Sequence, residues 1–448
     1  MKRFALLMAA SSFALGSFGD IRPATAASEI DALQAQIEAL ARQVEDLKRA
    51  QAAAEAKAAK RAEKAKDTGN KVLAKGSPGT FIIPGTNTEF HIGGYVKGDA
   101  IYDLSEDAGG DLFFANSIST GDANDESSFS AHARQSRLRV RTKTPTQFGD
   151  LKTLLEGDFF NTEGNEVISN SAGLRLRHAW GELGNWGVGQ FWTNFMPIES
   201  YPATVDFNGP AGLPFIRQVQ VRYTQNVSDN FKWTASLENS EFDGRGIGFD
   251  AANPTRIVTI GETTGFGGLD AGFDVAPDAT FAATYFDDWG LVKLAGVGRI
   301  LGNPNGGDEF GWGVNLSGNA KLWPGGKVNG SFSYGDGIGR YILNGVNNDG
   351  FIDATGDLET IEAYGLNVGV TQKVADNVTV GLQYGRYESL DTFAAGDIDT
   401  LNTVHATVFY KPLPRVTLGG EVIYGDREDQ DGDDDDAVRL QTSLQVNF

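Results

Sequence analysis

Short segments in which apolar and polar residues alternate recur along most of this chain, and this alternation constrains the fold more than any other feature. In residues 137–142, Leu138, Val140 and Thr142 share one face of an extended strand, and arginines occupy the other. In a water-soluble sheet the apolar face would meet a core and the arginines would meet solvent. One such strand alone favours that ordinary explanation.

Sixteen segments have the length and pattern of strands, which changes this interpretation. They are residues 90–103, 129–143, 150–161, 172–183, 185–193, 217–225, 230–240, 278–286, 290–301, 309–322, 327–335, 360–373, 377–388, 402–411, 415–425 and 437–448. Most have about the 9 to 11 residues that a tilted strand needs to cross a bilayer. Their polar faces are rich in Gly, Ser, Thr, Asn and Gln, as a water-filled lumen requires. We therefore predict an all-β transmembrane barrel of sixteen antiparallel strands.

The connections between these segments also indicate a membrane barrel. Short turns at residues 226–229, 323–326, 375–376 and 413–414 alternate with long segments at 104–128, 194–216, 241–277, 336–359 and 427–436. Short periplasmic turns and long outer loops are characteristic of outer-membrane barrels, whereas a soluble β-sandwich would not keep this alternation. The apolar faces should then meet lipid, Val314 among them. Aromatic residues near strand ends predict an interfacial girdle: Trp180, Trp186, Trp233, Trp289, Trp323 and Tyr410.

Composition excludes several other classes of protein. Beyond the N-terminus, no apolar run approaches the ~20 residues of a membrane helix, which excludes a helical membrane protein but not a barrel. The absence of cysteine excludes a disulfide framework and thiolate metal sites. The formal net charge is -21. This acidity concentrates in the predicted outer loops, whereas arginines concentrate on the strands.

The N-terminal region reads as a signal peptide over residues 1–26. Lys2 and Arg3 precede an apolar core, and Ala24, Thr25 and Ala26 form a small-residue cleavage site. Export and a barrel pattern together predict the outer membrane of a Gram-negative bacterium. Glycines and prolines make residues 69–88 a linker, and residues 89–448 form the predicted barrel.

Residues 27–68 are predicted to form a periplasmic coiled coil and helical stalk. Apolar residues occupy heptad positions a and d at Ile30, Leu33, Ile37, Leu40, Val44 and Leu47. An amphipathic helix lying on the barrel or the membrane is the alternative. Branched residues at a nominally favour two strands, but three heptads specify the number of chains only weakly. Lysines of the stalk could contact peptidoglycan, although a charged run is usually only a solvated face.

Basic and amide side chains on three strands are the candidate substrate pathway. They are Arg137, Arg139, Arg141, Arg175, Arg177, Arg217, Gln218, Gln220 and Arg222. A cationic wall in a confined lumen raises the local anion concentration, and planar guanidinium groups hold carboxylates through two N–H donors. The alternative is that lumen acids such as Asp99, Glu156 and Asp158 pair with the arginines and merely stiffen the wall.

The predicted loops suggest two further features. Residues 194–216 contain four prolines, and we expect them to fold into the barrel and narrow it, with an extracellular lid as the alternative. The outer loops are acidic, above all at residues 426–436. Such clusters could bind Ca²⁺ or join lipopolysaccharide through divalent cations, although solvated loops are the more ordinary explanation. No other cofactor or metal is expected.

Three sequence blocks are similar to a known family. They are IGGYVKGDAIYD at residues 92–103, RHAWGELGNWGVGQFWTNF at 177–195 and VDFNGPAGLPFIRQVQVRYT at 205–224. Behind an N-terminal coiled coil, they resemble the DcaP family of trimeric outer-membrane porins. The resemblance implies a homotrimer of sixteen-stranded barrels and uptake of small organic anions, dicarboxylates among them. Residues 241–277 and 336–357 match nothing in it.

The sequence thus favours a passive porin biased to organic anions. A general or cation-selective porin would follow if the lumen arginines are neutralised, and an envelope-tethering barrel would follow if a loop plugs the lumen. An enzyme is not expected, because His91, His132, His178 and His405 lie on separate segments without a nucleophile motif. Neither a nucleotide-binding loop nor a nucleic-acid partner is indicated.

Overall fold

The computed structural model describes most of the chain beyond residue 72 and parts of the region before it. The described residues are 38–39, 41–46, 48–49, 51–53, 56, 73–74, 79–105, 108–120, 126–161, 169–241, 244–250, 253–260, 273–303, 306–342, 349–353, 356–391 and 396–448. The predicted signal peptide and the linker's first residues lie outside them. The signal peptide therefore stays a prediction.

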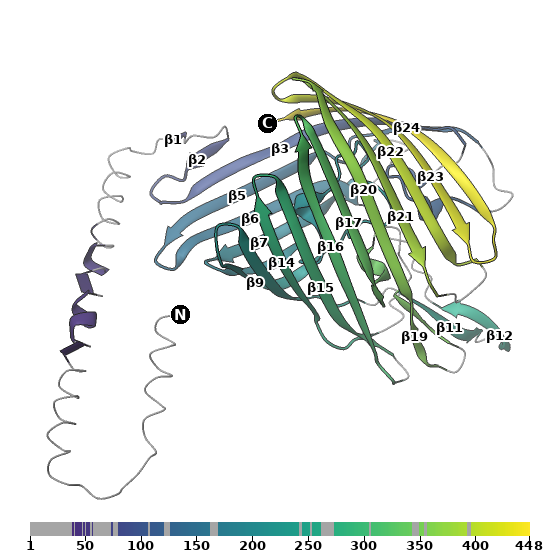
Figure 1. The fold of residues 1–448 in the computed structure, drawn as a ribbon, viewed down its shortest axis with the longest axis horizontal. Helices are drawn as coiled ribbons and strands as arrows, with labels where there is room; N and C mark the ends of the chain where they lie inside the picture. Colours follow the sequence, from purple (N-terminus) through teal and green to yellow (C-terminus); the bar gives the residue numbers. More distant parts are fainter. Residues whose placement is uncertain are drawn as a thin grey trace, which may run out of the picture. The chain divides into compact units, whose positions relative to one another are not determined.

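Within the described residues, sixteen antiparallel strands close into a barrel, as predicted (Figure 1). They are β3 (Glu89–Asp103), β5 (Arg137–Thr146), β6 (Gly149–Asn161), β7 (Gly173–Leu183), β8 (Trp186–Trp192), β9 (Arg217–Asn226), β10 (Phe231–Glu238), β14 (Asp278–Asp287), β15 (Gly290–Gly302), β16 (Glu309–Trp323), β17 (Gly326–Asp336), β20 (Glu362–Ala375), β21 (Val378–Ser389), β22 (Ile398–Leu413), β23 (Val416–Asp429) and β24 (Asp434–Asn447). Each predicted segment corresponds to one of these strands, except that residues 129–143 are divided between β5 and a short strand, β4 (Ser128–His132), which both pair with β3.

The last strand closes the barrel on the first. β24 pairs antiparallel with β3 from Arg439 opposite Asp103 to Asn447 opposite Tyr95. The backbone N–H of Phe448 then donates to the carbonyl of Gly94 at 3.1 Å. Closure leaves no free sheet edge, which is the condition for a sheet to sit in hydrocarbon, where no water can satisfy backbone groups.

The two faces of the strands are assigned as the sequence predicts. On β16, Phe310, Val314 and Leu316 are exposed on the outside, while the intervening Asn315 and Ser317 are buried inside. The same alternation holds on β24, where Leu440 and Leu444 are exposed outside and Gln441, between them, is buried inside. An exposed apolar belt around a polar interior is the arrangement of a barrel that faces lipid outside and water inside.

The aromatic girdle is confirmed at several positions and wrong at one. Trp186, Trp289, Trp323 and Tyr410 are exposed on the outer surface near strand ends. Trp180 is buried instead, and its Nε1 donates to Glu182 at 3.0 Å. A bulge between Glu156 and Gly157 of β6 changes the pairing with β7, so that simple alternation does not hold along β7.

Shorter elements lie between the barrel strands. They are β1 (Leu73–Ala74), β2 (Thr80–Ile82), β4 (Ser128–His132), β11 (Gly244–Asp250), β12 (Asn253–Ile260), β13 (Phe273–Asp274), β18 (Gly350–Ile352), β19 (Leu358–Thr360) and the 3₁₀ helices η1 (Ala115–Ser117), η2 (Ile198–Ser200) and η3 (Gly339–Tyr341). β1 and β2 fall within the predicted linker, and β2 pairs with β3. β12, β11, β18 and β19 form a separate small sheet from two outer connections.

The acidic segment at residues 426–436 is not the open loop that we expected. β23 continues to Asp429 and β24 begins at Asp434, so that only residues 430–433 form the turn. Cross-strand pairing holds Asp426 opposite Asp436 and Arg427 opposite Asp435. The two strands therefore continue beyond the residues that alternate between apolar and polar. Strand pairing does not require apolar residues outside the bilayer.

The described residues between 38 and 56 are helical, as predicted, and Arg42 lies 3.8 Å from Glu38 one turn away. None of the described helical segments is long and apolar enough to cross a membrane. A coiled coil requires partner helices, so that part of the prediction stays a prediction.

Replacing Val314 with arginine should impair assembly of the barrel. Val314 lies on the outer face of β16, and an arginine there would cost about 2 to 4 kcal/mol near the bilayer midplane. The measurement is the yield of the heat-resistant folded form in denaturing gels. The matched control is Leu322→Arg, near the end of the same strand, where the cost falls to about 0 to 1 kcal/mol. Equal yields from both variants would contradict the assigned face.

Candidate functional site

Residues 193–216, which connect β8 to β9, fold into the barrel as we expected. Phe195, Met196, Val205 and Leu213 are almost fully buried. The connection reaches the opposite wall, where the backbone N–H of Ala211 donates to Thr403 Oγ1 of β22 at 2.9 Å. We name this segment the inner loop. Its arrangement excludes the alternative of an extracellular lid.

Close approach of the inner loop to the wall depends on Gly212. Its φ is +75°, a region that favours glycine, and a Cβ there would clash with the carbonyl group of Arg386 on β21. Pro210 and Pro214 flank this glycine at short range. The prolines and the glycine of this segment therefore allow its backbone to pack closely against the far wall.

Two further connections also fold inward, which the sequence did not lead us to predict. Phe113 and Ile118 are buried in the connection after β3, and Ile338, Tyr341 and Ile342 are buried in the connection after β17. Together with inner-loop and wall residues they form one apolar cluster inside the barrel. A few large apolar residues within otherwise polar connections are the only sequence signal of this. These segments fill space beside the far wall.

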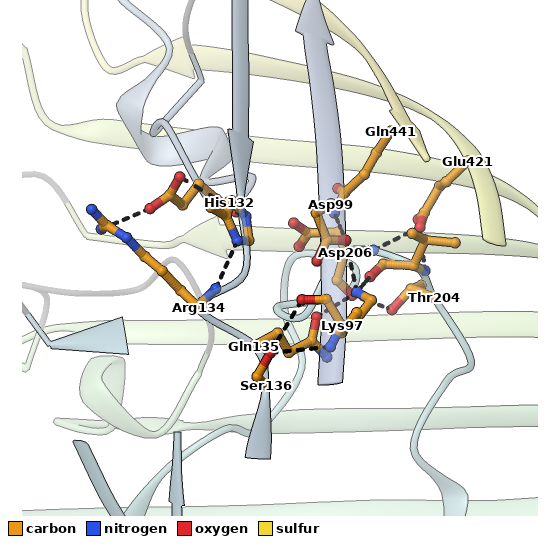
Figure 2. Close-up of polar contacts among 12 residues, drawn as sticks. Lys97, Asp99, His132, Arg134, Gln135, Ser136, Thr204, Asp206, Glu421 and Gln441 are labelled. Atoms are coloured by element: carbon orange, nitrogen blue, oxygen red, sulfur yellow. Dashed lines mark hydrogen bonds and ion pairs between the residues drawn. The ribbon is translucent and has the colours of Figure 1, made fainter. Parts of the chain in front are cut away.

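A clamp of charged side chains fixes the middle of the inner loop (Figure 2). Glu421 of β23 accepts hydrogen bonds from the backbone N–H groups of Val205 and Asp206, the second at 2.8 Å. Lys97 of β3 donates from Nζ to the Val205 carbonyl at 2.8 Å and lies 2.8 Å from Asp99. His405 Nδ1 lies 2.6 Å from the second oxygen of Glu421. We name Glu421 and Lys97 the loop clamp.

Asp206 ties the clamped segment to a second connection. Its carboxylate accepts a hydrogen bond from the backbone N–H of Phe113 at 3.1 Å, and Asn208 Nδ2 donates to the Phe113 carbonyl at 3.0 Å. All three residues are buried. Two wall strands and one neighbouring connection therefore hold residues 205–208 in place.

Five arginines gather on the wall of β5, β7 and β9, and β5 pairs with β3, the strand that carries Lys97 of the loop clamp. We name them the arginine cluster: Arg137, Arg139, Arg175, Arg177 and Arg217. Glu156 and Asp158 of β6 lie among them. Arg177 bridges both acids, at 2.8 Å from Glu156 and 2.9 Å from Asp158.

The remaining pairs of the cluster engage the same two acids. Arg139 lies 2.5 Å from Glu156, and Arg175 donates two hydrogen bonds of 2.9 Å to Asp158. Arg137 is more distant, at 3.6 Å from Glu156. Pairing with lumen acids, which we considered as the alternative to a functional ladder, thus occurs in part.

Pairing does not neutralise the cluster. Five guanidinium groups face two carboxylates, which leaves a surplus of three positive charges. Nε and Nη2 of Arg137 and Nη1 of Arg217 are buried, and they donate no hydrogen bond to any residue that the structure describes. Buried donors without acceptors are costly, so this wall is electrostatically suited to an anion.

A cavity of about 420 Å³ opens between the arginine cluster and the inner loop. Arg137, Arg139, Arg141 and Arg177 line it from the wall side. Tyr95 and Trp192 also line it from the wall, and the inner loop contributes Tyr201, Phe207, Phe215 and the acid Asp206. The space left by the inward connections therefore lies beside the cationic wall.

A family model for the DcaP outer membrane protein matches residues 20–258, more than half of the chain. The chain belongs to the DcaP family of outer-membrane proteins. No curated protein matches the sequence. This membership agrees with the resemblance inferred from the three sequence blocks, two of which contain the arginine cluster's Arg177 and Arg217 together with the clamped residues of the inner loop.

Solved structures share the fold of this DcaP-family chain. The DcaP channel of Acinetobacter baumannii has a TM-score of 0.69 at 24% identity, covering 81% of this chain and 98% of that one. An anion-selective porin from Comamonas acidovorans has a TM-score of 0.52 at 14% identity, covering 81% and 100%. The trimer form of an outer-membrane protein of Vibrio cholerae has a TM-score of 0.50 at 12% identity, covering 81% and 99%. At these identities the likeness concerns the fold.

Other predicted pathway residues of this DcaP-family barrel are engaged in the wall. Gln218 Nε2 donates to Glu238 at 2.7 Å and to the Tyr341 hydroxyl at 2.9 Å. Gln220 Nε2 and Arg222 Nη2 both donate to the Trp192 carbonyl, at 2.9 and 2.6 Å. None of these three predicted residues lines the cavity. They support β8 and the ends of the inner loop.

Arg141 extends the cationic wall of this family member toward the short turns. It borders a second cavity of about 390 Å³, together with Lys143 and Lys152. Asp150 lies 2.9 Å from Lys143 and Glu182 lies 3.5 Å from Lys152. Charge there is more evenly balanced than at the arginine cluster. Among the described residues, no group of three or more His, Asp or Glu is placed to hold a metal ion.

Replacing Glu421 with alanine should loosen the inner loop of this DcaP-family barrel. Two buried backbone N–H groups would lose their acceptor, at about 1 to 3 kcal/mol each. We expect larger and noisier single-channel currents in planar bilayers from a barrel that still folds. The matched control is Gln383→Ala, because Gln383 of β21 is also a buried lumen residue but bonds Asn329 of β17 and no member of the clamp. Currents indistinguishable from those of the control would contradict the clamp.

Proposed function

We propose that this DcaP-family protein is a passive porin that favours small organic anions, such as dicarboxylates, through its arginine-lined lumen. The observation that carries the proposal is the charge around the cavity of about 420 Å³, where Arg137, Arg139, Arg141 and Arg177 outnumber the two lining acids, Glu156 and Asp206. The buried N–H donors of Arg137 and Arg217 supply hydrogen-bonding capacity that the wall itself does not use.

Elementary electrostatics supports an anion bias at this place. Two unit charges about 4 Å apart interact by about 4 kcal/mol at an effective dielectric constant of about 20. Planar guanidinium groups bind carboxylates through two parallel N–H donors, which a monatomic anion cannot use equally well. The chain's net charge of -21 does not oppose this, because a passing ion responds to the charges that line its path.

We extend the proposal to the assembly and its surroundings. A homotrimer is supported by the trimer form of the Vibrio cholerae protein that shares the fold. The exposed apolar belt would contact outer-membrane lipid, and the acidic rim of β23 and β24 would approach lipopolysaccharide through divalent cations such as Ca²⁺. A periplasmic coiled coil near peptidoglycan completes the expected arrangement.

Replacing Arg139 with glutamate should lower anion preference while leaving the barrel folded. The change places an acid beside Glu156 and shifts the cavity wall by two charge units on its water side. The measurement is the reversal potential in a planar bilayer under a salt gradient. The matched control is Arg415→Glu, which makes the same charge change in an exposed turn between β22 and β23. Unchanged selectivity in the Arg139 variant would remove this residue from the pathway.

Succinate added to one side should reduce the chloride current of the wild-type protein. Its two carboxylates would occupy the arginine cluster in place of chloride. Cation selectivity without block would instead indicate a general porin in which Glu156 and Asp158 neutralise the wall. An absence of conductance would favour the envelope-tethering barrel, with the inward connections acting as a plug.

A further inference from the structure

Phe207 of the inner loop places its ring among three members of the arginine cluster. The ring centroid lies 5.0 Å from the guanidinium carbon of Arg177, and 5.7 Å from those of Arg137 and Arg175. A single aromatic ring thus contacts cations from two different strands, β5 and β7. Such contacts attract the guanidinium group to the face of the ring.

Phe207 also belongs to an aromatic group that restricts its movement. Its ring stacks on Phe160 of β6 at 5.6 Å and meets Phe215 edge-on at 5.7 Å. The backbone on both sides is fixed, because the loop clamp holds Val205 and Asp206, and the Tyr201 hydroxyl donates to the Asn208 carbonyl at 3.1 Å. The ring therefore stays at the arginine cluster without a covalent or ionic link to it.

This arrangement affects how the arginines can meet a ligand. A guanidinium group donates hydrogen bonds in its plane, whereas an aromatic ring contacts its face. Asp158 already accepts in-plane bonds from Arg175 and Arg177. Arg137 has Tyr95 at 5.2 Å as well as Phe207, while two of its buried N–H donors remain unused by the described residues. The ring thus lies against three guanidinium groups, while two buried N–H donors of Arg137 remain for a ligand.

We propose that Phe207 is a specificity-determining residue of the pore. Its ring holds the guanidinium groups of Arg137, Arg175 and Arg177 in fixed orientations. A carboxylate that binds them therefore does not have to immobilise these side chains at a further cost in conformational entropy. A halide gains less, because it does not accept two parallel N–H bonds in the same way. This inference rests on the proposed function and adds the residue that sets discrimination between carboxylates and halide.

The test compares chloride conductance and succinate block for four purified full-length proteins in planar bilayers. They are the wild type, Phe207→Ala, Phe207→Leu and Phe195→Leu. Leucine keeps most of the apolar volume but lacks the aromatic face. Phe195 is the matched control, since it is a buried phenylalanine of the same loop whose ring packs on Tyr341 at 5.6 Å. Heat-modifiable migration on gels verifies that each barrel has folded.

We expect both Phe207 variants to need about three- to tenfold more succinate for half-block, the loss anticipated for cation–π contacts of this kind. Chloride conductance should rise in Phe207→Ala and stay near the wild-type value in Phe207→Leu, because only alanine opens space. Phe195→Leu should keep the wild-type block. Unchanged half-block in Phe207→Leu would overturn the inference and leave the proposed function standing. A wild type without anion preference would overturn both.

Discussion

The requirement that every backbone polar group find a partner in hydrocarbon governs this structure. A strand in lipid cannot bond to water, so the sheet must close, and the pairing of β24 with β3 closes it. Once closure is fixed, outward positions must be apolar and inward positions are free to be polar. The arginines can face inward because Leu138 and Val140 on the same strand face out. The site is thus a consequence of the alternation that makes the barrel.

A barrel of this size would enclose a wide passage if its connections stayed outside. Three connections fold in, and their apolar residues pack against the walls of β20, β22 and β23 through Ala363, Leu401 and Ile423. The filled side and the cationic side are therefore different sides of one lumen. Asymmetric filling brings a ligand close to the arginines, where its charge interacts at short range rather than through bulk water. Chemistry on one wall depends on packing on the other.

Strands and faces could be predicted from the sequence because they follow a local rule with a period of two residues. The inner loop could be predicted in part, since Pro197, Pro202, Pro210 and Pro214 mark an unusual connection. The clamp could not, because Lys97, Glu421 and Val205 are far apart in sequence and meet only after closure. Trp180 was misplaced because a bulge interrupts the period locally. Long-range contacts and local irregularities of the strands are therefore the features that could not be predicted from the sequence.

The same distinction explains the candidate site. Residue type alone identified the arginines, but it could not tell Arg137, which lines the cavity, from Arg222, which donates to a backbone carbonyl. What separates them is the acceptor that each guanidinium finds. Arg222 donates hydrogen bonds to Trp192 and Gln220, whereas two buried N–H donors of Arg137 have no acceptor among the described residues. A wall arginine can bind a ligand when the fold surrounds it with too few acceptors. Here the inner loop brings the ring of Phe207 to the cluster, while the neighbouring carboxylate of Asp206 accepts a hydrogen bond from Phe113.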